Sequence, residues 1–147
     1  MKISNVITNA KNRESGAAMV LVALSMVVLL GMAAFGTDLA WFYLNASRVQ
    51  RAADAGALGG VVWLPSQAGT ANSTALAIAK QNGYDDTLPD VQVTSGVVAG
   101  ESNQLRVTVQ DVVPTFFAQI FGFNTMTIQR SAVAEYIPPL KLGSPAG

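Results

Sequence analysis

Three aspartates gather in one short stretch of the chain, where the segment GYDDTLPD holds Asp85, Asp86 and Asp90. Carboxylates are the ligands that calcium prefers, but their spacing here matches no calcium-loop motif. The chain also contains no His and no Cys, which removes the imidazole and thiolate ligands of most transition-metal sites. We therefore interpret this segment as a solvated turn and expect no metal site.

Other catalytic arrangements have no matching motif. Without His or Cys, a nucleophile and its base would have to combine Ser or Thr with Lys or a carboxylate, and no such motif occurs. A Gly-rich phosphate loop is also missing. The net charge is zero, which gives no reason to expect nucleic acid as a partner. We expect a non-catalytic protein with no cofactor and no small-molecule substrate.

The longest regular pattern is an apolar, helix-forming segment near the N-terminus. Residues 17–37 carry no charge, and twenty helical residues span about 30 Å, the hydrocarbon thickness of a bilayer. The chain has 147 residues, of which 50% are hydrophobic and only 12% charged, and this segment accounts for much of that imbalance. We predict a transmembrane helix over residues 17–37, called the span below, preceded by a cytoplasmic leader at 1–16.

The same helix is expected to continue outside the membrane over residues 38–63. Its apolar residues recur at spacings of three and four, which places them on one face, with Asn45 off that face. Gly56 and Gly60 lie four residues apart and would let another backbone approach closely. Alternatively, the second of these glycines simply ends the helix together with Gly59. The predicted packing face consists of Leu39, Phe42, Ala46, Val49, Ala53, Gly56 and Gly60.

Two aromatic residues follow the end of the span. Trp41 and Tyr43 match the aromatic belt that membrane proteins place at the membrane–water interface. Packing against the folded domain is the alternative use. Because both residues lie within two turns of residue 37, we interpret them as interface anchors.

The charges on either side of the span favour an N-terminus in the cytoplasm. Lys2, Lys11 and Arg13 precede the span, whereas Arg48 and Arg51 follow it. Basic residues near a span accumulate on the cytoplasmic side. The C-terminal part is therefore expected outside the cytoplasm.

A cleaved secretory signal is the alternative to a retained anchor. The small residues Gly31 and Ala33 resemble a cleavage region. However, the apolar run is long for a signal peptide, and cleavage there would leave an apolar N-terminus that begins near Phe35. We therefore expect the span to be retained.

Beyond a linker at 64–71, residues 72–138 are predicted to form a small α+β domain, followed by a flexible tail at 139–147. A period of two marks the strands, and Asn72 or Ser73 is expected to cap the first short helix. The apolar residues of the second short helix are expected to cover the sheet, namely Phe116, Phe117, Ile120 and Phe121. In chain order we predict a helix over 75–82, strands over 91–97 and 105–109, a helix over 115–122 and a strand over 125–136. The fold class is thus α+β, with a long N-terminal transmembrane-plus-amphipathic helix, a three-stranded sheet and two short helices.

Several features of residues 14–60 occur together in one known family. They are a Gly at the start of the span, an Asp just beyond it, an aromatic near Tyr43 and the run VQRAADAGAL. The matching motif residues are Gly16, Asp38, Gln50, Ala53, Asp54 and Ala55. In these features the chain resembles the TadE/TadG-like proteins of the tight-adherence (Flp) pilus assembly machinery, and most closely the TadG-like N-terminal module.

The resemblance implies a single-pass protein of the bacterial inner membrane that takes part in pilus biogenesis. Its N-terminus would be cytoplasmic and its C-terminal domain periplasmic or extracellular. Its partners would be membrane lipid and other pilus-assembly proteins or copies of itself. No catalytic role follows from the resemblance.

One residue departs from the pilin pattern. Pilins and TadE-type pseudopilins resemble one another in having a Glu five residues after the Gly, which prepilin peptidase and the assembly machinery use. Counted from Gly16, that position here holds Leu21. We therefore predict inefficient prepilin processing and an assembly factor or pseudopilin-like component. The alternatives are a structural subunit of a pilus-like filament, packed through its N-terminal helix, and a secreted binding module.

Overall fold

The computed structural model describes residues 4–139, with side chains from residue 16 onwards. The start of the predicted leader and most of the predicted tail lie outside these residues. In chain order the elements are α1 Ser4–Val61, α2 Ala68–Gln81, β1 Val91–Val98, β2 Glu101–Pro114, the 3-10 helix η1 Ala118–Phe121 and β3 Thr125–Glu135. The predicted α+β fold with a long N-terminal helix is confirmed.

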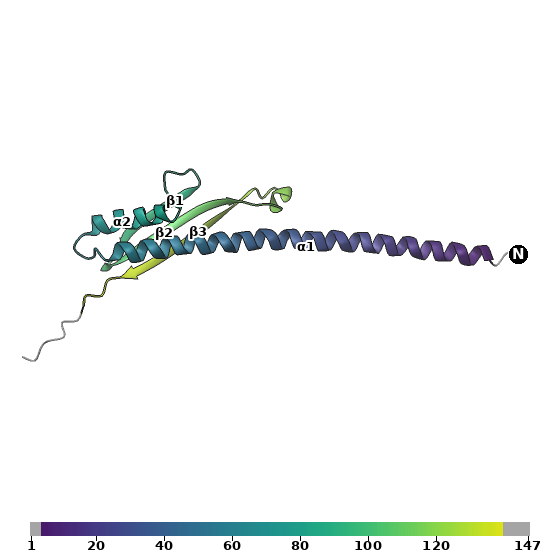
Figure 1. Ribbon diagram of the computed structural model, residues 1–147, viewed down its shortest axis with the longest axis horizontal. Helices are drawn as coiled ribbons and strands as arrows, with labels where there is room; N and C mark the ends of the chain where they lie inside the picture. Colours follow the sequence, from purple (N-terminus) through teal and green to yellow (C-terminus); the bar gives the residue numbers. More distant parts are fainter. Residues whose placement is uncertain (1–3, 140–147) are drawn as a thin grey trace, which may run out of the picture.

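Helix α1 is a single rod of 58 residues, about 87 Å long at the usual helical rise. Figure 1 shows that its N-terminal half extends well beyond the rest of the molecule. In the part of the chain that the structure describes, this is the one helix long and apolar enough to cross a membrane. Ser25 and Thr37 do not interrupt it, because each hydroxyl donates to a carbonyl one turn back, as Ser and Thr in helices often do.

The sheet has the order β1-β2-β3, and both pairs of neighbouring strands are antiparallel. Val109 of β2 pairs with Val93 on one side and Arg130 on the other, so β2 is the central strand. One face of the sheet is polar, where Thr108 donates to Ser131 across β2 and β3. The other face is apolar and needs a cover, as antiparallel sheets with one wet face do.

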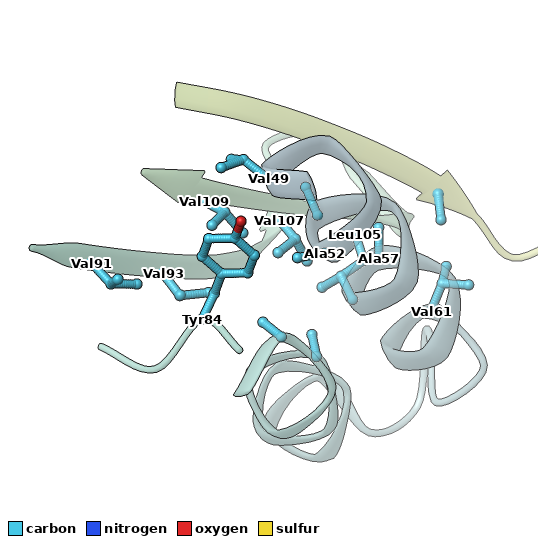
Figure 2. Close-up of a cluster of buried hydrophobic side chains, with 14 of the residues drawn as sticks. Val49, Ala52, Ala57, Val61, Tyr84, Val91, Val93, Leu105, Val107 and Val109 are labelled. Carbon is cyan, nitrogen blue, oxygen red and sulfur yellow. The ribbon is translucent and has the colours of Figure 1, made fainter. Parts of the chain in front are cut away.

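The C-terminal half of α1 and helix α2 together cover the apolar face. Figure 2 shows side chains of α1 and β2 meeting in this core, with the ring of Tyr84 turned into it from the segment after α2. The largest side chains of the core that are fully buried are Leu105, Ile128, Val49, Val107 and Val109. The apolar face of the sheet therefore packs on α1 and α2.

Helix α2 begins at Ala68, seven residues earlier than predicted, so the end of the predicted linker is helical. Tertiary packing explains the difference, because Ala71 is buried with Ala75 in the core and extends the contact toward the N-terminus of α2. Asn72 is not a cap. Its Oδ1 accepts a hydrogen bond of 3.0 Å from the Ser95 hydroxyl on β1.

The segment after β2 also differs from the prediction. Pro114 ends β2 rather than starting a helix, and the helix that follows is one short 3-10 turn. Phe116, Phe117, Ile120 and Phe121 do not cover the sheet, because α1 and α2 already occupy its apolar face. They are instead exposed, by 48%, 41%, 76% and 80% respectively.

Candidate functional site

The first candidate region is the junction where α2 crosses α1. A Cβ atom added to Gly60 would lie 2.6 Å from the Ala71 carbonyl oxygen and 2.5 Å from Cδ2 of Leu105. One added to Gly56 would lie 3.1 Å from the Ala75 carbonyl oxygen. All three distances are shorter than ordinary van der Waals contact, so the glycines allow the backbone of α2 to reach α1. This glycine junction holds the two helices as one layer.

The predicted packing face divides along the helix. Ala46, Val49 and Ala53 are buried beside the two glycines, and Phe42 is half-buried against the same core. Leu39 is 43% exposed. Next to Leu39 in the chain, Asp38 contacts the connection between β2 and β3.

Polar residues near this face also have defined places. Asn45, which was predicted to lie off the packing face, is buried. Its Nδ2 donates a hydrogen bond of 2.8 Å to the Trp41 carbonyl oxygen. Two residues of the family motif contact each other, because Gln50 Nε2 donates 2.8 Å to Asp54 Oδ1. Ala55, beside them in the motif, is half-buried. These contacts are all local to α1.

The second candidate region is the aromatic tip, residues 115–124, which connects β2 to β3. Its backbone forms hydrogen bonds within the tip. Thr115 N–H donates to Asn124 O at 3.0 Å, and Phe123 N–H donates to Ala118 O at 3.2 Å. Gly122 turns the chain in the left-handed region at φ 90°, which a residue without Cβ adopts freely. The tip is therefore an ordered turn rather than a loose loop.

Asp38 fastens this tip to α1. Its Oδ1 accepts hydrogen bonds from Phe116 N–H at 2.8 Å and Phe117 N–H at 3.2 Å. Its Oδ2 accepts from Phe117 N–H at 3.0 Å and Ala118 N–H at 2.6 Å. The side chain is 6% exposed. Backbone donors to a carboxylate make strong, charge-assisted hydrogen bonds, so one residue on α1 holds three consecutive peptide groups about 80 positions away.

The two predicted interface aromatics have different surroundings. The Trp41 ring packs edge-on against Phe116 of the tip, with ring centroids 5.4 Å apart. Its indole Nε1 is buried and has no hydrogen-bond partner among the residues that the structure describes. Tyr43 is 65% exposed and contacts Phe42 on its own helix. Trp41 thus contacts the folded domain, and Tyr43 faces outward.

An apolar hollow of about 680 Å³ lies between the tip and the end of the span. Side chains of the tip form one wall, including Phe117, Ile120, Phe121 and Phe123. Helix α1 forms the other wall from Leu30 to Asp38. Three of these tip side chains are among the most exposed large apolar residues described, at 76%, 80% and 67% for Ile120, Phe121 and Phe123.

A polar groove of about 560 Å³ opens on another side of α1, where the segment after α2 meets β2. Arg48 and Arg51 line it together with Tyr84 and Asp111. Burial raises the pKa of the Tyr84 hydroxyl, and burial also raises the pKa of the Asp111 carboxyl. The groove combines two cations, one carboxyl and one phenol, without a nucleophile–base pair among them.

The aspartate cluster forms a local ion pair. Asp85 Oδ2 lies 2.8 Å from Lys80 Nζ, and Asp85 Oδ1 accepts a hydrogen bond from Thr87 N–H at 3.1 Å. The Lys80 contact, followed by that backbone hydrogen bond, lowers the pKa of Asp85 to about 2. Within residues 16–139, whose side chains are described, no group of three carboxylates is placed to hold a metal ion.

Comparison with known proteins connects this geometry to one family. Residues 16–77 match the model of the Tad family, described as "Putative Flp pilus-assembly TadE/G-like". The match covers α1 from residue 16 to its end and most of α2, and it confirms the resemblance drawn from the sequence. No curated protein and no solved structure matches the chain.

Proposed function

We propose that this protein is a non-catalytic, single-pass membrane component of Flp-type pilus biogenesis. The observation that carries the proposal is the family match over residues 16–77, which includes both a membrane-length apolar helix and the glycine junction. The matched region is thus the anchor together with the part of the domain that fixes α2 to it. Partners in this role are other pilus-assembly proteins and membrane lipid.

The exposure of α1 supports a division into a span and a stem. Over residues 16–37 every side chain is exposed except Ala34, which is half-buried beside the tip. From Asp38 onward, buried positions recur at helical spacing. We propose that residues 17–37 lie in the bilayer and that residues 38–61 form the stem on which the sheet folds, outside the cytoplasm.

An assembly factor is favoured over a filament subunit by the residue at position 21. In an apolar filament core, a carboxylate and a neighbour's amino terminus attract strongly because water is absent, and either charge alone is costly there. Leu21 supplies no such carboxylate. A span that stays in the bilayer does not need one. The filament subunit remains the second candidate, because the exposed apolar half of α1 would equally suit packing between copies.

The test combines deletion with fractionation in the native cell. We expect deletion of the gene to abolish surface filaments and the wild-type chain to restore them. Mass spectrometry of sheared filaments and of membranes should place the chain in the membrane fraction. Stoichiometric recovery from the filaments would replace the assembly factor with the subunit, and normal filaments without the gene would refute both.

A matched pair of substitutions tests the span itself. Leu24→Lys places a charge on an exposed position of the span, and Leu58→Lys places one at a similarly exposed position of the stem. A charge at the centre of a membrane helix costs about 2.5–3.5 kcal/mol on insertion scales. We expect Leu24→Lys alone to reduce the membrane-bound fraction. Equal behaviour of the two variants would contradict membrane insertion of residues 17–37.

A further inference from the structure

The aromatic tip lies alongside the span rather than beyond its end. The hollow between them has Leu30 in one wall, and Leu30 lies about 12 Å before Asp38 along the helix axis. Figure 1 shows the connection between β2 and β3 reaching back along α1 toward its N-terminal half. A bilayer that surrounds the span up to residue 37 would therefore also surround the far end of the tip.

The chemistry of the tip suits that position. No charged residue occurs between Asp111 and Arg130. The outermost side chains are Ile120, Phe121 and Phe123, and all three are mostly exposed. Exposed apolar clusters on a folded protein mark surfaces that bind lipid or protein. The depth of this cluster along α1 selects lipid.

The backbone of the tip is also prepared for an apolar medium. Lipid offers no hydrogen bonds, so peptide groups at that depth need partners within the protein. The N–H groups of Ile120 and Gly122 donate within the turn, to Phe117 O and Gln119 O, both at 3.0 Å. The three N–H groups at the start of the tip donate to Asp38. Asp38 is the first charged residue after the span, and its carboxylate accepts the hydrogen bonds of these N–H groups.

From these observations we infer that the aromatic tip is a second membrane-inserted element. Resting on the proposed function, in which the span lies in the bilayer, the tip enters the leaflet on the far side from the cytoplasm. Lipid acyl chains fill the hollow between the tip and α1. Asp38 is the positioning residue that holds the tip at this depth. The domain is thereby held at two points, so its sheet keeps a fixed orientation to the membrane surface.

The test uses the absence of cysteine from the chain. Three single-cysteine variants of the full chain are each reconstituted into phosphatidylcholine–phosphatidylglycerol vesicles and labelled with a nitroxide. Ile120→Cys reports on the tip, and Leu24→Cys on the span. Ile137→Cys is the matched control, because Ile137 is as exposed as Ile120, 76% in both cases, but follows the opposite end of β3. Collisions with dissolved oxygen and with a water-soluble nickel complex give the depth of each label.

We expect the label at position 120 to behave like that at position 24, accessible to oxygen and protected from nickel. The label at position 137 should be accessible to nickel. A nickel-accessible position 120 beside a protected position 24 would overturn the tip inference and leave the span intact. Nickel access at position 24 would refute the proposed function instead. Protection of position 120 from both reagents, growing with the protein-to-lipid ratio, would assign the hollow to a second copy.

A second pair of variants tests the role of Asp38 in the Ile120→Cys background. Asp38→Asn replaces one carboxylate oxygen by an NH₂ group, which cannot accept from the N–H groups of the tip. Asp54→Asn is the control, since Asp54 Oδ1 accepts a hydrogen bond from Gln50 on the same helix. We expect Asp38→Asn alone to increase the mobility of the label and its nickel accessibility. Unchanged depth in Asp38→Asn would remove the positioning role, whereas insertion itself is decided by the labels above.

Discussion

Substitution of Gly60 by alanine should destabilise the domain although it adds a single methyl group. The new Cβ would lie 2.6 Å from the Ala71 carbonyl oxygen and 3.0 Å from Ala75 Cβ. The oxygen belongs to the backbone of α2, so relief requires the whole helix to move away from α1. Leu105, one of the largest buried side chains, would also have to shift.

The magnitude follows from two opposing effects. Overpacking a well-packed core typically costs about 1–3 kcal/mol, whereas replacing Gly by Ala within a helix gains about 1 kcal/mol of helix propensity. We therefore expect a net loss of up to about 2 kcal/mol for Gly60→Ala, with a middle value of about 1 kcal/mol. For a folded unit of this size, a loss of about 1 kcal/mol lowers the melting temperature by about 4–8 °C. Thermal unfolding of the full chain in detergent micelles, followed by tryptophan fluorescence, measures this melting temperature.

Three other glycines serve as matched controls. Gly69→Ala adds its Cβ to open space on α2 and should melt at or slightly above the wild-type temperature. Gly59→Ala meets only the end of the Ile78 side chain, which can turn aside, so its effect should be smaller than that of Gly60→Ala. Gly56→Ala meets the Ala75 carbonyl at 3.1 Å and should fall between. If Gly60→Ala melts no lower than Gly69→Ala, the close approach of the helices does not exist.

Three further predictions concern the ion pair, processing and topology. The pKa of Asp85 is lowered to about 2 in the folded protein, below its unfolded value of about 3.9. The contribution of the Asp85 carboxylate to the free energy of unfolding is therefore present above about pH 4 and is lost as the pH falls toward 2. Asp85→Asn should therefore melt below the wild type at neutral pH, and acid titration of both melting temperatures should close the gap; a constant gap would contradict the ion pair. Co-expression with a prepilin peptidase should leave the chain uncleaved after Gly16, because Leu21 occupies the Glu position, and intact-mass measurement of a species beginning at Ala17 would refute this. External protease should digest the exposed segments after Asp38 in spheroplasts, and full protection of the domain would reverse the proposed orientation.

The main elements could be predicted because their patterns are local. An uncharged run of membrane length and the three–four spacing after it identify α1 without any tertiary knowledge. Alternation of Val with polar residues similarly identifies the central strand. The start of α2 could not be found in this way, because Ala71 becomes helical through burial against α1. Neither a capping residue nor a charge in the sequence marks that contact.

The tip shows where sequence reasoning fails for a physical reason. Apolar residues such as Phe116 and Ile120 are normally assigned to a core. The pattern of apolar and polar residues in the sequence cannot reveal that other side chains already fill that core. That information lies in the pairing of β2 with β3 and in the cover that α1 and α2 provide. Asn45 presents the opposite case, a polar residue that is buried because its amide bonds to its own helix. In both cases the surroundings of the side chain, rather than its type, decide its exposure.

Asp38 links α1 to the aromatic tip. The sequence marks it as an acidic residue just beyond the span and as part of the family motif, and an exposed carboxylate would fit both descriptions equally well. The structure instead buries it and surrounds it with the N–H groups of Phe116, Phe117 and Ala118. A carboxylate so close to a bilayer is costly unless it is fully hydrogen-bonded, and peptide N–H groups at that depth are costly for the same reason. Each satisfies the other, so Asp38 and the apolar tip act as one unit in the proposed insertion of the tip into the membrane.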